Sequence, residues 1–433
     1  MERLLAIKML NKTFTKNGYS NIVVDNALSS SNLTSQQKKL CSILYYGVLE
    51  RKITLDYIVC RYSKKPLDKL DTSVLNILRC GIYQILYLDS IPDSASVNES
   101  VNLAKKLRLS SASGFINAIL RGFIRDGKTY PLPKDVLNSL SIQYSAPVWL
   151  VDRLLKEYDR EVAISLLETS VQKAPVTFRV NSAVCSDTEC LDALGTLKAE
   201  KVECLEHSYS LTSGDITSTE AFKQGMLHVQ DLSSQLCCKA LSPKPTDIVL
   251  DICSAPGGKT FTLAETMENK GTIYAFDLHQ NRVNLIRNGA ERLHLTNVIA
   301  QVGDGSKYNS SLPMADKILC DVPCSGLGVI RRKPEIKYKN PKDFENLPNV
   351  QYKILENASK YLKVGGELVY STCTLSRAEN DDVIKKFLSL NDNYIGIPFL
   401  QSLGEPFGSS TATVCPKYYN SDGFFIAKLK RVK

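Results

Sequence analysis

The sequence predicts a multidomain protein in which an all-α N-terminal bundle is followed by an α/β domain with a mostly parallel sheet. Residues 1–128 repeat apolar side chains at helical spacing and lack strand-like alternation. The prolines of TYPLPKD end this pattern near residue 130. From about residue 244, short β-rich runs alternate with helical patterns, which is typical of a parallel sheet covered by helices. We therefore divide the chain into residues 1–130, a linker and small mixed α/β subdomain at 131–240, and the α/β domain at 241–433.

The helical domain is clearest in DTSVLNILRCGIYQILYL, where apolar residues from Val74 to Leu86 fall on one stripe and Asp71 or Thr72 can serve as the N-cap. The segments SVNESVNLAKKLRL and ASGFINAILRGFIR repeat the pattern, which favours a small helical bundle. In the mixed subdomain, helical VWLVDRLLKEY leads into strand-like APVTFRVN.

Composition indicates a soluble globular protein, because 43% of the 433 residues are hydrophobic and 23% are charged. The N-terminal MERLLAIKMLNKTF lacks the uninterrupted apolar region of a signal peptide. No apolar stretch approaches the roughly 20 residues that span a bilayer. We expect a cytoplasmic location and no membrane partner.

The cysteines indicate reduced thiols. Their number, 13, is odd and their spacing is irregular, which argues against a disulfide framework. C-x-x-C is absent from the sequence and the four histidines are scattered, so we expect no metal site.

The positive charge is concentrated in the helical domain. Residues 1–130 hold 19 Lys and Arg against 10 Asp and Glu, an excess of 9 that equals the net charge of the whole chain, +9. A basic surface can simply aid solubility, but a basic module joined to a neutral one is also typical of an enzyme that binds nucleic acid.

The strand ends of the α/β domain predict a nucleoside site. The first strand, DIVLDIC, runs into SAPGGKT, whose tight turn directs backbone N–H groups above the sheet. A P-loop is excluded because Cys253 stands where its first glycine is required, and the dinucleotide fingerprint is absent. Asp277, Asp304 and Asp321 close the next three strands, YAFD, NVIAQVG and DKILCD, and the first of them is placed to bind ribose hydroxyls. A nucleoside site without phosphate-binding machinery points to S-adenosylmethionine.

Two cysteines follow adjacent strands at the same edge of this sheet. Cys324 comes after the fourth strand and Cys373 after the fifth, each in a polar context that enters a loop. Free cysteine is usually a buried apolar residue, and we expect that role for a second group, namely Cys41, Cys60, Cys80, Cys237 and Cys238. Methylation at C5 of cytosine needs a thiolate that adds at C6, whereas methylation of an exocyclic nitrogen or a ribose hydroxyl does not. Asp321 could hold the N3/N4 edge of that base. Spacing alone does not decide which thiol attacks.

These motifs resemble a known family. LDICSAPGGKT, FDLHQNRV, GDGS, DVPCSGLGVIRRKPEIKY, GGELVYSTCTLSRAEND and DGFFIAKL together resemble the Nol/Nop/Sun family of RNA cytosine-5 methyltransferases over about residues 145–433. Residues 1–128 resemble a NusB-type RNA-binding domain. The resemblance implies a Rossmann-like, S-adenosylmethionine-dependent methyltransferase domain that forms 5-methylcytosine in small-subunit ribosomal RNA.

By similarity, Cys373 matches the nucleophile of the family and Cys324 the second cysteine, which is assigned to product release. Asp321 is the third catalytic residue that we expect, on the chemical argument given above. The cofactor contacts map onto one loop and four further positions, which are Cys253, Ser254, Ala255, Pro256, Gly257, Gly258, Lys259, Asp277, Arg282, Asp304 and Asp321. Ser254, Val322 and Thr374 depart mildly from the common pattern and leave the exact loop geometry open.

The basic segment VIRRKPEIKY follows the Pro-Cys motif, and we expect Arg331, Arg332, Lys333 and Lys337 to clamp RNA phosphates. We also expect a target cytosine that is single-stranded or flipped out. No obligate protein partner is predicted. Two alternatives are a transfer-RNA methyltransferase with the same core and a non-catalytic RNA-binding factor.

Overall fold

The computed structural model describes residues 1–16 and 20–433, which form two compact units. The first contains Met1–Lys173 and Ile330–Lys339, and the second contains Ala174–Val329 and Asn340–Lys433. The sequence-based division did not place residues 330–339 with the N-terminal domain. Within the described residues, no helix is both long enough and apolar enough to cross a membrane.

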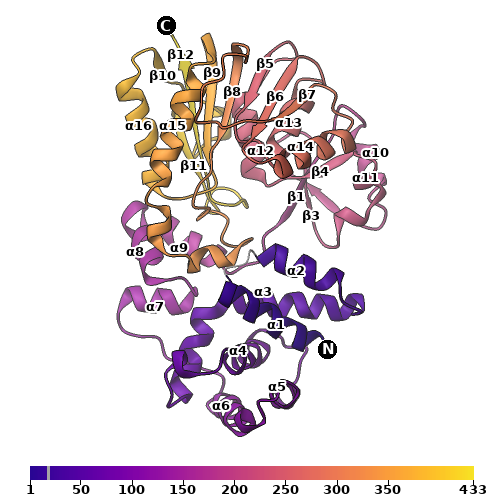
Figure 1. The fold of residues 1–433 in the computed structure, drawn as a ribbon, viewed down its shortest axis with the longest axis vertical. Coiled ribbons are helices and arrows are strands. Elements are labelled where there is room, and N and C mark those ends of the chain that lie inside the picture. The colour runs from indigo at the N-terminus through magenta and orange to yellow at the C-terminus, as the bar shows by residue number, and fades with distance from the viewer. Residues whose placement is uncertain (17–19) are drawn as a thin grey trace. The chain divides into compact units, whose positions relative to one another are not determined.

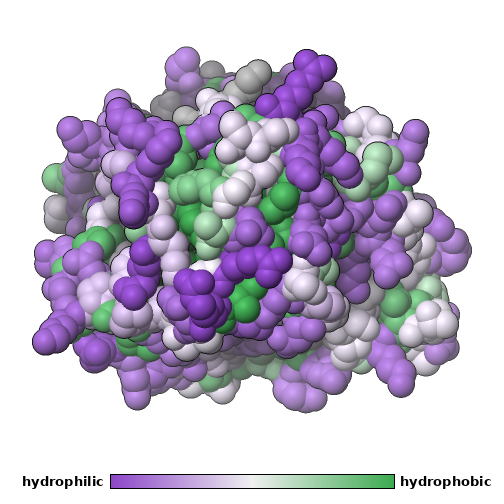
Figure 2. All heavy atoms as spheres, turned by 90° about the horizontal axis from the view of Figure 1, so that it is seen from below, coloured by the Kyte–Doolittle hydropathy of each residue, from purple (hydrophilic) through white to green (hydrophobic). Residues whose placement is uncertain are grey.

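The first unit is helical (Figure 1). Its α-helices are α1 (Glu2–Lys16), α2 (Ser20–Ser29), α3 (Ser35–Tyr62), α4 (Thr72–Tyr87), α5 (Asp93–Lys106), α6 (Ser113–Arg125), α7 (Val136–Gln143), α8 (Val148–Glu157) and α9 (Arg160–Thr169). The predicted stripe lies on α4, where Val74, Leu78 and Ile82 are buried in the core of this unit. Asp71 is its N-cap, because the carboxylate accepts hydrogen bonds from the N–H groups of Ser73 and Val74. The face of the molecule in Figure 2 is mostly hydrophilic, with hydrophobic residues in small areas between the polar side chains.

A short segment from far along the chain completes this unit. The 3-10 helix η4 (Pro334–Tyr338) packs against α3. The Lys337 ammonium donates to the carbonyl of Glu50 at 2.7 Å, and the Tyr338 hydroxyl donates to the carbonyl of Leu49 at 2.6 Å. The segment that follows the Pro-Cys motif in sequence is therefore held by the helical unit.

The second unit contains two sheets. The smaller is antiparallel with the order β2-β3-β1-β4, built from β1 (Val176–Val180), β2 (Ala199–Lys201), β3 (Ser208–Leu211) and β4 (Leu227–Val229). Two short helices, α10 (Asp187–Asp192) and α11 (Glu220–Lys223), belong to this subdomain. It contains the strand that APVTFRVN predicted.

The larger sheet has eight strands in the order β10-β12-β9-β8-β5-β6-β7, with β11 paired to β12. Its strands are β5 (Ile248–Asp251), β6 (Thr272–Asp277), β7 (Val298–Val302), β8 (Ala315–Asp321), β9 (Leu362–Thr372), β10 (Tyr394–Gly396), β11 (Thr411–Val414) and β12 (Phe424–Arg431). The strands from β9 to β7 are parallel, and the pairs that β12 forms are antiparallel. The parallel strands are the five that the sequence predicted.

Helices cover both faces of this sheet (Figure 1). They are α12 (Leu232–Leu241), α13 (Gly258–Thr266), α14 (Gln280–Arg292), α15 (Leu347–Ser359) and α16 (Asp381–Leu390). Alternate strand residues enter separate cores: Val249 packs with residues of α12, α13 and α14, and Leu250 packs with residues of α15 and α16. This alternation fixes the faces of the sheet and leaves the carboxyl ends of its parallel strands for the site.

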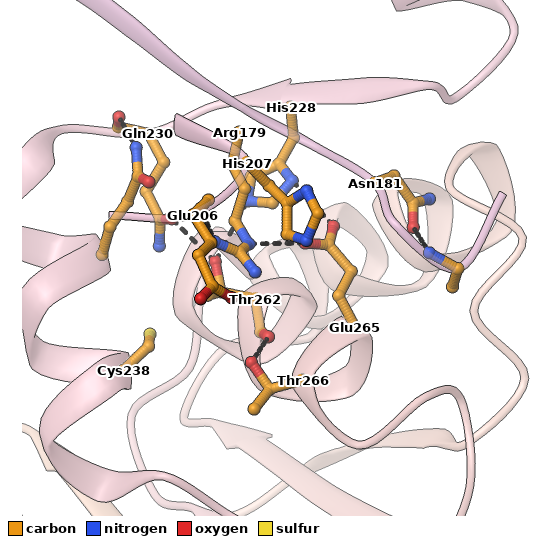
Figure 3. A network of polar contacts seen from close by, with 12 residues as sticks. Arg179, Asn181, Glu206, His207, His228, Gln230, Cys238, Thr262, Glu265 and Thr266 are labelled. Carbon is orange, nitrogen blue, oxygen red and sulfur yellow. Dashed lines mark hydrogen bonds and ion pairs between the residues drawn. The ribbon is translucent and has the colours of Figure 1, made fainter. Parts of the chain in front are cut away.

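A buried polar network joins the smaller sheet to α13 (Figure 3). The Arg179 guanidinium of β1 pairs with the carboxylate of Glu265 on α13 at 2.9 Å. His228 of β4 places Nδ1 3.1 Å from the other carboxylate oxygen and Nε2 3.2 Å from the Thr262 hydroxyl. The Glu265 side chain is fully buried, and the bonded Arg179 guanidinium offsets the cost of removing its carboxylate from water. The network fixes α13, which begins at the glycine-rich loop.

Candidate active site

The two predicted thiols meet at the carboxyl ends of neighbouring parallel strands. Asp321, the last residue of β8, is paired in register with Ser371 near the end of β9. Cys324 and Cys373 follow these strands, and their Sγ atoms are 3.3 Å apart. Both side chains are half-buried. The Gly328 N–H donates to the carbonyl of Cys373 at 3.0 Å, which joins the two loops. The sequence placed both cysteines at one edge of the sheet, and the structure brings their sulfurs together there.

The Cys324 thiol has a raised pKa. Its hydrogen bond with Cys373 raises the pKa of the Cys324 thiol well above its ordinary value, and burial and the nearby carboxylates of Glu379 and Asp321 raise it further. The two sulfurs share one hydrogen-bonded site, so ionisation of one thiol leaves the other as its proton donor.

Asp321 has two partners in addition to its place beside the thiols. The Lys259 ammonium lies 2.7 Å from one carboxylate oxygen, and the Ser371 hydroxyl donates to the other at 2.8 Å. Burial by itself lowers the pKa of Lys259, but the charge of Asp321 outweighs it, so that the pKa of Lys259 is raised overall. The Lys259 ammonium therefore keeps its proton. Sequence reasoning placed Lys259 only among cofactor contacts and missed this pairing, because the two residues are 62 positions apart.

The glycine-rich loop has the geometry that its sequence requires. Gly257 caps α13 with φ of 110°, a conformation that side chains rarely adopt, and a Cβ there would lie 2.3 Å from the ring of Phe261. The N–H and hydroxyl of Ser254 both donate to the carbonyl of Phe276, at 2.7 and 2.9 Å. These bonds hold the loop against the end of β6, beside the predicted ribose-binding aspartate.

A buried acid at the end of β5 is bonded to the start of the helix that follows the same loop. Asp251, the last residue of β5, is fully buried and accepts a hydrogen bond from the Thr260 hydroxyl at 2.7 Å. Burial raises the pKa of Asp251 to about 7. Cys253 and Gly258 complete the loop, together with the cis Ala255–Pro256 peptide.

Two more strand-end aspartates lie on this edge of the sheet. Asp277 is 4% exposed and pairs with Arg282 at 3.1 Å, and the same guanidinium donates to the carbonyl of Ala255 at 2.9 Å. Asp304 follows β7, and a hydrogen bond from the Ser306 hydroxyl is the main cause that lowers its pKa. Arg282 therefore links Asp277, the predicted ribose-binding residue, to the glycine-rich loop.

A cavity of about 210 Å³ opens beside Asp304. Its lining is mainly apolar and includes Ile252, Phe276 and Leu312. A Cβ on Gly303 would come within 2.9 Å of the Phe276 ring. An apolar cavity that is also lined by Asp304 suits a flat heterocycle with an amino group. The residues present therefore fit a nucleoside cofactor.

The basic segment at residues 331–337 is less exposed than a set of phosphate contacts requires. The prediction of a phosphate contact is wrong for Lys337, because its side chain is fully buried and bonded to Glu50. Burial also lowers its pKa, to about 7. Arg331 is buried and Arg332 half-buried, while Lys333 is exposed. Among the cysteines expected to be buried, Cys60 is exposed and the other four are buried.

Family profiles match nearly the whole chain. The profile described as 16S rRNA methyltransferase RsmB/F matches residues 238–430, the NusB family profile matches 1–125, and a ferredoxin-like domain of RsmF/B-like methyltransferases matches 146–213. These matches confirm the predicted fold class, a helical NusB-like domain followed by a Rossmann-like methyltransferase domain.

Curated relatives and a solved structure agree with the profiles. The chain is 36% identical to the "Probable ribosomal RNA small subunit methyltransferase B" of Bacillus subtilis, covering 99% of this chain and 98% of the relative. It is 31% identical to the ribosomal RNA small subunit methyltransferase B of Proteus mirabilis, covering 94% and 96%. The structure of a methyltransferase homolog protein from Pyrococcus horikoshii superposes with a TM-score of 0.59 at 31% identity, covering 69% of this chain and all of the other.

Proposed function

Because the chain belongs to the family of ribosomal RNA small subunit methyltransferases B and is therefore an RNA methyltransferase, we propose that it forms 5-methylcytosine in small-subunit ribosomal RNA through a covalent cysteine adduct. The observation that carries this proposal is the 3.3 Å separation of the Cys324 and Cys373 sulfurs at the strand ends beside Asp321. A methyltransferase that acted on a nitrogen or a hydroxyl would have no use for two thiols in that place.

The covalent route follows from the chemistry of cytosine, whose C5 is a poor nucleophile. A thiolate adds to C6 and the ring electrons move to C5, which then forms the new bond to the methyl carbon. The C5 proton then leaves to a base, the C6–S bond breaks, and the thiolate is regenerated. The proposal needs one sulfur to attack and one ionisable group to assist release, and two adjacent thiols supply both.

The family resemblance supports Cys373 as the attacking thiol and Cys324 as the residue that assists release. The raised pKa of Cys324 fits this assignment, because a thiol that keeps its proton is a poor first nucleophile. In this scheme Asp321 holds the N3/N4 edge of the base, and Lys259 orients that carboxylate.

S-adenosylmethionine would supply the methyl group. We propose that Asp277 and Arg282 hold its ribose end, and that the loop from Cys253 to Lys259 faces its amino-acid portion. The apolar cavity beside Asp304 would take the adenine ring.

We propose that the RNA presents a single-stranded or flipped-out cytosine, since a stacked base could not reach sulfurs that are half-buried. Lys333, which is exposed, and Arg332 are the remaining candidates for phosphate contact. The NusB-like domain and its excess of positive charge support binding of ribosomal RNA. A ribosomal RNA substrate implies action in the cytoplasm, and the proposal includes no obligate protein partner.

The test compares purified small-subunit ribosomal RNA with transfer RNA as acceptors of a labelled methyl group, followed by nucleoside analysis. We expect label in 5-methylcytosine from ribosomal RNA. Label confined to transfer RNA would show that the chain is a transfer-RNA methyltransferase. Label on a nucleoside other than 5-methylcytosine would contradict the covalent route.

A further inference from the structure

A carboxylate that takes no part in the scheme above lies behind the two thiols. Glu379 belongs to a short 3-10 helix after β9 (Arg377–Glu379) and is 2% exposed. One carboxylate oxygen accepts the N–H of Ser325 at 2.9 Å and the amide of Gln351 at 2.9 Å, while the other accepts the Ser325 hydroxyl at 2.6 Å. A buried carboxylate is costly unless it is bonded in this way, so its place in the core calls for an explanation.

Besides Gln351 of α15, Glu379 contacts the residues that follow the two cysteines in the chain. Ser325 follows Cys324, and its hydroxyl lies 2.6 Å from that of Thr374, which follows Cys373. Glu379 is thus bonded to the Cys324 loop at two points. It is bonded to the Cys373 loop through the Ser325–Thr374 hydroxyl pair and by a long hydrogen bond from the Thr374 hydroxyl at 3.5 Å.

The next residue fastens the second loop independently. The Asn380 amide donates to the carbonyl of Thr374 at 3.0 Å, and its oxygen accepts the Thr372 hydroxyl at 2.6 Å. These bonds lie on either side of Cys373. The Tyr370 hydroxyl donates to the carbonyl of Glu379 at 2.6 Å, which ties the 3-10 helix itself to β9.

We propose that Glu379 is a positioning residue that sets the separation of the Cys324 and Cys373 thiols by fastening both of their loops to one carboxylate. The proposal rests on the proposed function, in which the two sulfurs act in turn on one cytosine. If the loops move apart by about 1 Å, the second thiol no longer reaches the adduct that the first has formed, and such a misplacement can lower turnover about 100-fold.

Geometry and charge can be separated at this position. In Glu379→Gln, the amide oxygen can accept from the Ser325 N–H and from Gln351, while the amide nitrogen donates to the Ser325 hydroxyl. That variant keeps the fastening and loses the charge. Glu379→Ala loses both.

The matched control is Glu367→Ala. Glu367 lies on β9, the strand that precedes Cys373, and its carboxylate pairs with Lys317 and Lys428. It is six residues before the thiol, roughly 20 Å along an extended strand. Its loss disturbs the same strand without touching either thiol loop.

The first readout measures thiol geometry without RNA. Diamide oxidises two neighbouring thiols to a disulfide while it is itself reduced to a hydrazine, and peptide mapping quantifies the Cys324–Cys373 disulfide over time. We expect Glu379→Ala to form this disulfide at least about tenfold more slowly than the wild type, because the sulfurs must come to about 2.05 Å to bond. Glu379→Gln and Glu367→Ala should stay within about threefold of the wild-type rate.

The second readout is methyl transfer. We expect Glu379→Ala to lower kcat about 100-fold while the KM for S-adenosylmethionine stays within about twofold. Glu379→Gln should recover most of this loss. Its pH profile should shift to lower pH, because the charge of Glu379 is one of the causes that raise the pKa of Cys324.

A wild-type rate of disulfide formation in Glu379→Ala overturns the proposal. If this variant fails to fold, Ser325→Ala replaces it in the test, because it removes the hydrogen bond from the Ser325 hydroxyl to Glu379. An unchanged rate of disulfide formation in Ser325→Ala also overturns the proposal. Slower disulfide formation together with a wild type that labels no cytosine would support the positioning role and refute the proposed function instead.

Discussion

The Lys259 ammonium and the Asp321 carboxylate form an ion pair with a separation of 2.7 Å near Cys324. The side chain of Lys259 is 13% exposed, and the Ser371 hydroxyl satisfies the second oxygen of Asp321. The loss of either partner leaves the other charge poorly solvated, an effect of about 3 kcal/mol or more for buried pairs.

We therefore predict that Lys259→Met and Asp321→Asn each lower kcat by at least about 100-fold, because each disturbs the group that would hold the base edge. The double variant should be little worse than either single one, since the residues act as a unit. Lys270→Met removes an exposed pair with Glu268 and serves as the control, with no expected change in rate. Steady-state methyl transfer measures all four, and additive losses would show that the two residues act separately.

Asp277 should govern affinity for the cofactor. Its carboxylate is almost fully buried and pairs with Arg282, which also bonds the loop at Ala255. Asp277→Asn should weaken binding of S-adenosylmethionine about 10- to 100-fold, the loss expected for a hydrogen bond to a charged group. Calorimetric titration of the folded variant measures this. Wild-type affinity would mean that the nucleoside binds elsewhere on the sheet edge.

Asp251 should make stability depend on pH. Burial raises its pKa from 3.8 to about 7, so between these values the folded chain retains a proton that the unfolded chain has lost. The contribution of Asp251 to stability is therefore full below about pH 4 and is lost as the pH rises toward 7. Relative to the wild type, Asp251→Asn should gain free energy of unfolding between pH values of about 4 and 8, on the order of 4 kcal/mol. Urea unfolding at both ends of this range measures it, and a constant difference would contradict the assignment.

Lys333 and Lys337 should differ in their effect on RNA binding. Lys333 is exposed, whereas Lys337 is buried with its ammonium on the Glu50 carbonyl. Lys333→Ala should reduce the slope of log affinity against log salt by about 1, as the loss of one phosphate contact does. Lys337→Met should leave the slope unchanged. Filter binding at several salt concentrations distinguishes them, and a lower slope for Lys337→Met would show that this lysine reaches RNA.

Local sequence patterns were sufficient for several elements, including the five parallel strands, and for the positions of the strand-end residues. The apolar stripe of α4 and its cap at Asp71 depend on residues a few positions apart, so spacing predicts them. The aspartates at the strand ends were also predictable, because parallel strands bring their carboxyl ends to one edge. The pairing of Cys324 with Cys373 followed from the same argument.

Long-range packing was not predictable in this way. Lys337 looks like a surface residue in a basic run, but it is bonded to a carbonyl 287 positions earlier in the chain. Glu379 lies in a motif whose letters indicate a polar turn, and its role depends on Ser325 and Gln351, which come from two other segments. Periodicity and spacing carry no information on such contacts, because they depend on how distant elements meet.

The most direct test of the covalent two-thiol route is denaturing-gel analysis of Cys324→Ala incubated with small-subunit ribosomal RNA and S-adenosylmethionine, with Cys373→Ala in parallel. The scheme predicts a slow-migrating, nuclease-sensitive band for Cys324→Ala, because the adduct forms and its release stalls, and no such band for Cys373→Ala. A band for Cys373→Ala alone would reverse the two roles. No band for either variant, with wild-type methylation of the same RNA intact, would contradict the covalent route.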